Sequence, residues 1–491
     1  MIRQNFNADW MVEKGDGNSR MNSFLGNTQT KTVHLPYDAM IHEARTPDTK
    51  NGAQTGFYPG GEYIFQKHFT APQAWQGKPV SLVFEGVYQT ALVYLNGWLL
   101  TRNVNGYAEF TVEAGPYLKY GADNLLKVIA DNSLEPNSRW YTGSGIYRPV
   151  RLLVGNKVYL PQDTVRITTR EADEGFALLD VTAQVQSAST VTERVTLQQT
   201  ICRKGTAVLT DRQNLLLQPG ESRTVSFRYC VDSPALWSPE NPNLYTSTMQ
   251  VLEGEEELDR EETGFGIRTL SIDAAHGVRI NGQTVKLRGA CIHHDNGILG
   301  AATLPDAEER RIRQLKEAGF NAIRSSHHPA GRALLDACDR YGVLVMDELS
   351  DVWNVRKNPY DYALYFEQDW KPTIQKMVAK DYNHPSVILY LSLIHISEMC
   401  IRDRCGQRDL RGRLGKRSRD QPSALQHLPG TGSHPLHHQR PQRPYGSRLP
   451  PAGDHGGCDA KVPGTARSFR RRWRRQQCPE QLYEPDVRGK G

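Results

Sequence analysis

Residues Asn321–Trp353 read NAIRSSHHPAGRALLDACDRYGVLVMDELSDVW, and this stretch decides the fold. It begins with a short apolar strand that ends at Arg324. A histidine-rich loop closed by Pro329 follows, and after it leucines and a cysteine recur at helical spacing. The apolar run Val343–Met346 has the length and composition of a buried strand. The order strand, helix, strand predicts a βαβ unit, from which parallel sheets are built.

Polar residues mark the ends of both predicted strands. Arg324 and His327 lie at and just after the end of the first strand, and Asp347 and Glu348 end the second. In a parallel barrel the carboxyl ends of the strands open on one mouth, and that mouth carries the chemistry. We therefore expect these four side chains to face one mouth.

The sequence on either side extends this unit into part of a barrel. Asn281-Gly282 predicts a hairpin, and Val285–Cys291 predicts the first barrel strand. Asp306–Phe320 and Phe366–Tyr382 have helical periodicity, and Val387–Tyr390 begins a fourth strand. Four of the eight strands of a (β/α)8 TIM barrel are predicted, and an incomplete barrel of this kind leaves open sheet edges.

Two β-sandwiches are predicted before the barrel. Short alternating strands fill residues 1–155, where Asn96-Gly97 is a strong hairpin signal because both residues tolerate positive φ. Residues 156–272 alternate in the pattern of an immunoglobulin-like sandwich, to which we assign no chemistry. The incomplete barrel then covers residues 273–390, and residues 391–491 form a tail that we expect to be disordered and non-native.

The net charge of +6 is concentrated in the tail. Residues 401–491 hold 20 Lys and Arg against 8 Asp and Glu, whereas residues 1–400 hold 40 against 46. The arginine run Arg470–Arg475 alone would suggest a nucleic-acid binder, and deleting the tail would test that alternative. We expect no nucleic-acid partner and no membrane partner. The first residues lack a basic region followed by an apolar one, so we expect a cytoplasmic protein unless the true start lies upstream.

A family resemblance rests on three motifs. NAIRSSHHP at 321–329, MDE at 346–348 and LRGACIHHDNGILGAA at 287–302 resemble the barrel of glycoside hydrolase family two, in the form of its bacterial β-galactosidase branch. The resemblance covers residues 1–390 and implies that the first sandwich is a jelly roll. It also implies a retaining glycosidase that acts on terminal β-galactosides or oligosaccharides. β-Glucuronidase, β-mannosidase and a non-catalytic carbohydrate-binding protein are the alternatives, and the oligomeric state is open.

The resemblance also assigns substrate-binding roles. It implies that His293 and His327 hydrogen-bond sugar hydroxyls, that Arg324 orients carboxylates at the mouth and that Glu348 supports this shell. For four neighbouring aromatic side chains we expect packing rather than substrate contact: Trp140, Tyr141, His294 and His328. The run His293-His294-Asp295 matches no familiar zinc spacing, so we expect neither a metal nor another cofactor.

Retaining glycosidases need two carboxyl groups about 5 to 5.5 Å apart. Asp381–Tyr390 resembles the family's approach to the acid/base glutamate, which should follow an Asn directly after the fourth strand. Glu398 has no preceding Asn and comes about two residues late, so we do not expect it to act as the acid/base. No glutamate matches the nucleophile. The chain as written is therefore expected to be inactive.

The codons explain why the resemblance stops at Tyr390. Leu391–Ile396 can be encoded by CTGTCTCTTATACACAT and Met399–Arg404 by ATGTGTATAAGAGACAG, which are reverse complements of each other. They resemble the transposon end used in preparing sequencing libraries. We infer an artefactual junction after Tyr390, followed by a tail that continues out of frame.

Overall fold

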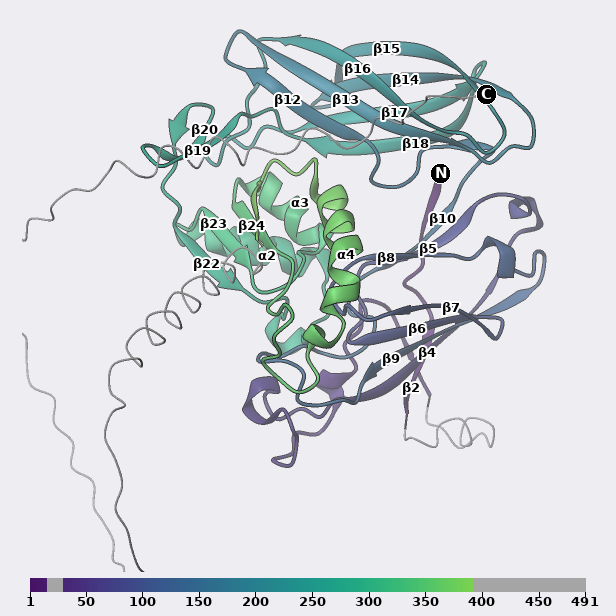
Figure 1. Ribbon diagram of the computed structural model, residues 1–491, viewed down its shortest axis with the longest axis vertical. Coiled ribbons are helices and arrows are strands. Elements are labelled where there is room, and N and C mark those ends of the chain that lie inside the picture. The colour runs from purple at the N-terminus through teal and green to yellow at the C-terminus, as the bar shows by residue number, and fades with distance from the viewer. Residues whose placement is uncertain (16–29, 392–491) are drawn as a thin grey trace, which may run out of the picture. The chain divides into compact units, whose positions relative to one another are not determined.

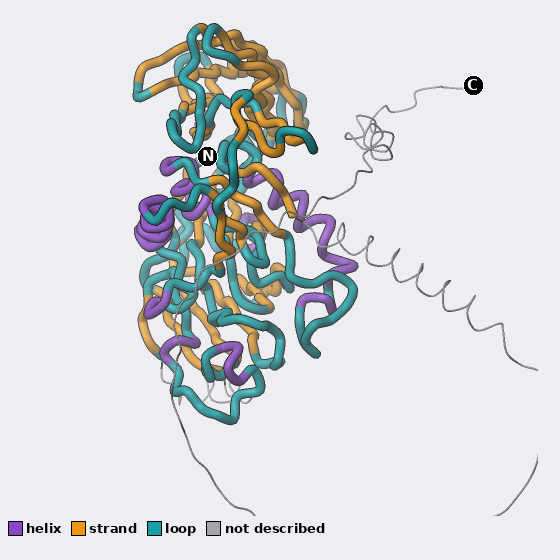
Figure 2. The backbone as a smooth tube through the Cα atoms, turned by 90° about the vertical axis from the view of Figure 1, so that its left-hand side faces the viewer, coloured by secondary structure: helices purple, strands orange, loops and turns teal. Residues whose placement is uncertain are grey.

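The computed structural model describes residues 1–15 and 30–391, and Figure 1 shows them as two β-sandwiches and a helix-flanked sheet. The predicted tail therefore lies outside the described residues from residue 392 onward. Figure 2 shows the second sandwich as strands and loops without helices. The three α-helices of the described residues follow it in the chain and alternate with the strands of the parallel sheet.

The first sandwich has a six-stranded sheet of order β3-β2-β4-β9-β6-β7 and a four-stranded sheet of order β1-β10-β5-β8. Its core includes the fully buried side chains of Trp10, Phe65 and Phe84. The predicted hairpin at Asn96-Gly97 joins β6 to β7, and both residues have positive φ, 52° and 90°. The strands of this sandwich are β1 (Ile2–Asn5), β2 (Trp10–Gly15), β3 (Lys31–Val33), β4 (Gly61–Thr70), β5 (Val80–Phe84), β6 (Thr90–Leu95), β7 (Trp98–Asn103), β8 (Phe110–Glu113), β9 (Asp123–Asn132) and β10 (Val150–Val154).

The second sandwich packs two antiparallel sheets around a separate apolar core. In one sheet β13 pairs with β11, β12 and β16, and the other has the order β15-β14-β17-β18. Buried and exposed residues alternate along β13 and β16, as the sequence pattern predicts for strands with one face in the core. The strands are β11 (Val158–Tyr159), β12 (Arg166–Ala172), β13 (Phe176–Ser187), β14 (Glu193–Arg203), β15 (Thr206–Leu217), β16 (Ser222–Asp232), β17 (Tyr245–Glu253) and β18 (Glu256–Phe265).

A small antiparallel sheet connects this sandwich to the parallel sheet. Its strands are β19 (Leu270–Asp273), β20 (Gly277–Ile280) and β21 (Gln283–Thr284), and Asn281-Gly282 makes the predicted turn between the last two. The described residues also contain short 3-10 helices: η1 (Met40–His42), η2 (Gly52–Thr55), η3 (Gln73–Trp75), η4 (Gly115–Tyr117), η5 (Gly297–Leu299) and η6 (Tyr362–Leu364).

The parallel sheet has the order β22-β23-β24-β25, so chain order and spatial order agree. Apolar side chains on one face pack against the helices, and those on the other face form a second cluster with Trp237 of the second sandwich. This confirms the predicted incomplete barrel, of which the described residues supply four strands and three helices. These elements are β22 (Gly289–Ile292), α2 (Pro305–Glu317), β23 (Ala322–Ser325), α3 (Arg332–Tyr341), β24 (Leu344–Glu348), α4 (Phe366–Asp381) and β25 (Val387–Leu391).

The predicted start of the first barrel strand is wrong. The sequence suggests a strand over Val285–Cys291, but β22 begins at Gly289. Gly289 is level with Ala322, the first residue of β23. A parallel strand needs a neighbour to accept its hydrogen bonds, and β23 provides none before this level.

Candidate active site

The predicted binding residues lie together at the carboxyl end of the parallel sheet. His293 directly follows β22, Arg324 lies in β23, His327 follows that strand by two residues, and Glu348 ends β24. Parallel neighbours in register bring these positions to the same edge of the sheet. The local βαβ geometry therefore assembles the cluster.

Glu348 holds Arg324 and His327 of this cluster in place. Its carboxylate is completely buried and accepts two hydrogen bonds from Arg324, from Nε and Nη2, each at 2.9 Å. His327 Nδ1 lies 3.0 Å from Oε2 of the same carboxylate. The hydrogen bonds to Glu348 raise the pKa of Arg324, so the guanidinium stays charged. Both oxygens of Glu348 are engaged, whereas Arg324 and His327 keep part of their surface open to a ligand.

His293 is held separately, by the loop after β23 and by the first sandwich. Its Nδ1 lies 2.7 Å from the carbonyl oxygen of Ser326, which leaves Nε2 as a hydrogen-bond acceptor. Trp140 stacks on the imidazole with ring centroids 5.0 Å apart and an angle of 9° between the planes. Trp140 also donates from its indole N–H to the Tyr107 hydroxyl at 3.1 Å. The packing role that the sequence suggests for Trp140 is confirmed, and it brings the first sandwich to the mouth.

Asp347 does not join the mouth, so the expectation for this residue is wrong. Its side chain is fully buried, and Oδ1 accepts a hydrogen bond from the backbone N–H of Ala330 at 2.9 Å. Burial and the nearby carboxylate of Asp381 raise the pKa of Asp347 well above its usual range. Consecutive residues of a strand point to opposite faces, so Asp347 and Glu348 cannot both face the mouth.

His294 and His328 are packed as expected, but in the interior and not at the rim where the sequence suggests loop histidines. Each is almost completely buried, and Tyr107 stacks on His328 with ring centroids 4.3 Å apart. Burial lowers the pKa of His294 to about 3 and that of His328 well below its usual value. Both imidazoles are therefore neutral at ordinary pH, and the sequence gives no signal for this because either residue reads as a loop histidine.

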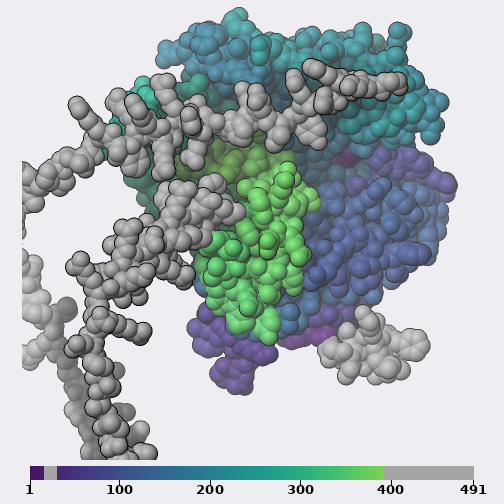
Figure 3. All heavy atoms as spheres, viewed as in Figure 1, coloured from purple at the N-terminus to yellow at the C-terminus, as the bar shows by residue number. Residues whose placement is uncertain are grey.

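The sequence reasoning missed a charged group beside the mouth. A small pocket of about 40 Å³ is bordered by Trp140, His327 and Asp351. Asp351 accepts two hydrogen bonds from Arg139, at 3.1 and 2.6 Å, and one from Lys357 at 2.8 Å. Arg139 lies 212 residues from Asp351 along the chain, so no local pattern could reveal this pairing. Gln89 and Arg102 of the first sandwich donate hydrogen bonds to Tyr360 and Tyr365, which precede α4. Figure 3 shows the atoms of this part of the chain against those of the first sandwich.

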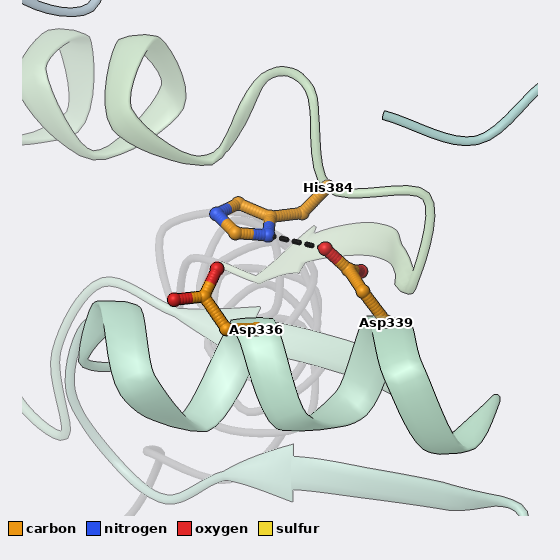
Figure 4. Close-up of side chains that lie close together, drawn as sticks. All are labelled: Asp336, Asp339 and His384. Carbon is orange, nitrogen blue, oxygen red and sulfur yellow. Dashed lines mark hydrogen bonds and ion pairs between the residues drawn. The ribbon is translucent and has the colours of Figure 1, made fainter. Parts of the chain in front are cut away.

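A second polar cluster lies where β25 begins, at the other end of the sheet from the mouth. Among the described residues, the side chains close enough to hold a metal ion together are Asp336 and Asp339 of α3 and His384 of the loop before β25 (Figure 4). His384 Nδ1 lies 2.6 Å from Asp339, whose other oxygen accepts from the backbone N–H of Ser386 at 3.0 Å. Both oxygens of Asp339 therefore have hydrogen-bond partners, and these contacts join α3 to the loop before β25.

The alternative metal run His293-His294-Asp295 does not converge. His293 contacts Ser326, and His294 Nε2 lies 2.9 Å from the carbonyl oxygen of Thr142. Glu398 lies outside the described residues, so the expectation that it does not act as the acid/base stays a prediction. No helix within the described ranges is long and apolar enough to span a membrane.

The described residues thus form two sandwiches followed by a parallel barrel sheet, with His, Arg and Glu side chains at its carboxyl end. Three sequence models of one family match consecutive parts of the chain. They are "Glycosyl hydrolase 2 galactose-binding domain-like" over residues 13–176, "Glycosyl hydrolases family 2" over 158–268, and "Glycosyl hydrolases family 2, TIM barrel domain" over 274–394. The chain belongs to glycosyl hydrolase family 2.

Similar proteins agree with this assignment. The β-galactosidase BoGH2A of Bacteroides ovatus is 37% identical over 389 residues, which are 79% of this chain and 46% of the relative. A family 2 structure from Bacteroides cellulosilyticus is 37% identical with a TM-score of 0.77, over 80% of this chain and 51% of that one. A β-glucuronidase structure from Bacteroides uniformis is 27% identical with a TM-score of 0.70, over 80% of this chain and 46% of that one. The chain spans about half the length of these relatives.

Proposed function

We propose that this sequence belongs to a retaining glycoside hydrolase that acts on terminal β-galactosides. The observation that carries the proposal is the cluster of His293, Arg324, His327 and Glu348 at the carboxyl end of the sheet. In this cluster the buried Glu348 carboxylate holds Arg324 and His327 in place, while both keep exposed surface. Hydrogen-bonding side chains held rigidly at a barrel mouth suit the recognition of sugar hydroxyls.

A neutral sugar fits the charges beside the mouth better than a uronic acid does. The cations next to the small pocket are Arg139 and Lys357, and both already pair with Asp351. A glucuronide carboxylate would have to compete with Asp351 for these two cations, or with Glu348 for the partly exposed Arg324, and either competition costs free energy. β-Glucuronidase nevertheless stays the second candidate, because relatives with that name occur among the similar proteins.

We propose further that the 491-residue chain binds sugar without hydrolysing it. Both oxygens of Glu348 are engaged by Arg324 and His327, and Asp347 is buried away from the mouth. Among the residues that the structure describes, the mouth therefore lacks the pair of free carboxyl groups that retention of configuration requires, about 5 to 5.5 Å apart. The protein would then behave as a carbohydrate-binding remnant of an enzyme.

Side-by-side assays test both parts of this proposal. The purified chain and a version with the reading frame restored after Tyr390 are given chromogenic β-galactoside, β-glucuronide and β-mannoside. We expect turnover by the restored version alone, with the galactoside preferred. Dominant glucuronidase activity of the restored version would overturn the substrate assignment. Turnover by the present chain that disappears in Glu398→Gln would overturn the proposed inactivity.

Binding is measured by calorimetry with galactose. We expect saturable binding by the present chain, lost in Arg324→Ala and kept in Arg313→Ala, whose guanidinium lies on the exposed side of α2. Equal binding by both variants would show that the mouth cluster is not the sugar site.

A further inference from the structure

A small polar cavity lies behind the mouth, where the first sandwich meets the parallel sheet. Its volume is about 10 Å³, and its lining includes Arg148 of the first sandwich, His294, Glu308 of α2, and His328. These four residues are 2 to 5% exposed. The cavity also borders His293, so it lies directly behind the mouth.

Each of these four residues has a buried atom without a hydrogen-bond partner. The atoms are Arg148 Nε, His294 Nδ1, Glu308 Oε2 and His328 Nε2. Buried polar atoms in folded proteins are paired almost without exception, with protein or with ordered water. Glu308 Oε2 lies 3.6 Å from Arg311 in an ion pair but accepts no hydrogen bond, so four atoms around one cavity are left to hydrogen-bond a ligand.

The hydrogen-bond roles of these atoms are fixed by their neighbours. His294 Nε2 lies 2.9 Å from the carbonyl oxygen of Thr142, so the proton is on Nε2 and Nδ1 accepts. His328 Nδ1 faces the carbonyl oxygen of Pro329 at 3.3 Å, which makes Nε2 the acceptor. Together with the carboxylate oxygen of Glu308, the cavity offers three acceptors. The N–H of Arg148 Nε is its donor.

The surrounding charges exclude an ion. Arg148 and Arg311 both border the cavity, and Arg311 lies 3.6 Å from Glu308. A cation would have to enter beside two guanidinium groups, which is costly in a buried site. An anion would face two imidazole lone pairs and a carboxylate. A neutral molecule that both accepts and donates hydrogen bonds fits the charges, and the volume is that of a single water.

We propose that this cavity binds one water molecule, which accepts a hydrogen bond from Arg148 and donates to two of the acceptors on His294, His328 and Glu308. His294 and His328 directly follow His293 and His327 of the mouth. The water thus ties the first sandwich to two of three elements, the two histidine loops and α2, and therefore always to at least one histidine loop. It supports the backbone that presents His293 or His327.

A crystal structure of the chain at about 2 Å resolution or better tests the proposal. We expect one density peak within hydrogen-bond distance of at least three of the four atoms, with no anomalous signal and no bound metal by elemental analysis. An empty cavity, an ion, or imidazoles that pair directly with Glu308 would each overturn it.

Two variants of neighbouring residues sharpen the test. Glu308→Leu removes one acceptor and fills the space, so the density peak should disappear. Glu309→Leu changes the next residue, which pairs with Arg340 on the exposed side of the helix, and the peak should stay. Loss of the peak in Glu309→Leu would contradict the proposal. Should Glu308→Leu fail to fold, the crystal structure of the parent chain decides alone, because an empty cavity there overturns the proposal.

Discussion

Acid should destabilise this protein through His294, a histidine that the fold buries in its neutral form. The side chain is 5% exposed, and burial lowers its pKa from about 6.5 to about 3. Below pH 6.5 His294 binds a proton in the unfolded chain, whereas in the folded chain it stays neutral until the pH approaches 3. The contribution of His294 to stability is therefore fully present above pH 6.5 and is lost as the pH falls toward 3.

The size of the effect follows from the same two pKa values. In the unfolded chain the imidazole has a pKa of about 6.5, so pH 5 lies about 1.5 units below it, and each unit corresponds to about 1.4 kcal/mol. The folded imidazole is still neutral at this pH. Moving from pH 8 to pH 5 should therefore cost about 2 kcal/mol through His294 alone, a large share of the stability of a typical domain.

Urea unfolding followed by tryptophan fluorescence measures this effect, because Trp140 stacks on the neighbouring His293. His294→Gln keeps a donor for Thr142 but cannot titrate, so its loss of stability between pH 8 and pH 5 should be smaller by about 2 kcal/mol. His328 is present in parent and variant and cancels in the comparison. The control is His34→Gln, at a side chain that is 71% exposed, and it should behave like the parent. An equal pH dependence in His294→Gln and the parent would refute the reasoning.

Three further predictions concern charged side chains. Arg324→Lys replaces a two-pronged donor with a single one, so galactose affinity measured by calorimetry should fall about tenfold, or about 1.4 kcal/mol. Burial lowers the pKa of His384, but its pairing with Asp339 outweighs this, and the pKa is raised. The stabilising effect of His384 is therefore fully present below pH 6.5 and is lost as the pH rises through the raised pKa. The melting temperatures of His384→Gln and the parent should converge between pH 6 and 9. Arg332 bridges Glu109 and Asp163, and Arg332→Met should lower the unfolding free energy by about 3 kcal/mol in urea titrations, unlike a change at an exposed arginine.

The sequence predicted the parts of the fold that depend on local patterns. Asn96-Gly97 and Asn281-Gly282 form turns because few other pairs of residues accept positive φ at two consecutive positions. Alternation located β13 and β16, and helical spacing located α4. The sequence also predicted the mouth cluster, because a βαβ unit places the carboxyl ends of its two strands side by side.

Long-range pairing and the direction of single side chains were beyond the sequence. Arg139 and Asp351 meet because two domains touch, and neither residue has a local motif. Asp347 and Glu348 were expected on the same side because both end a strand, although strand alternation separates them.

The register of the fourth strand indicates where the missing acid should lie. Leu391, the last described residue, is level with Glu348, and the two strands are parallel. The residues that follow Leu391 in an uninterrupted barrel would therefore rise just past Glu348 at the mouth, within reach of a glycosidic oxygen. A strand at this position should continue through small residues to an Asn-Glu pair, and the present sequence has none there. Resequencing the source DNA across the codon for Tyr390 should remove the inverted repeat and restore this pair in an open frame. Residues 429–435 can be encoded so that a one-base forward shift reads Gln-Glu-Leu-Asp-Pro-Thr-Arg, and the restored frame should contain these residues there. Independent reads that reproduce Leu391–Arg404 in genomic DNA would show instead that the interruption is natural, and the barrel would then end in a strand that carries no acid to its mouth.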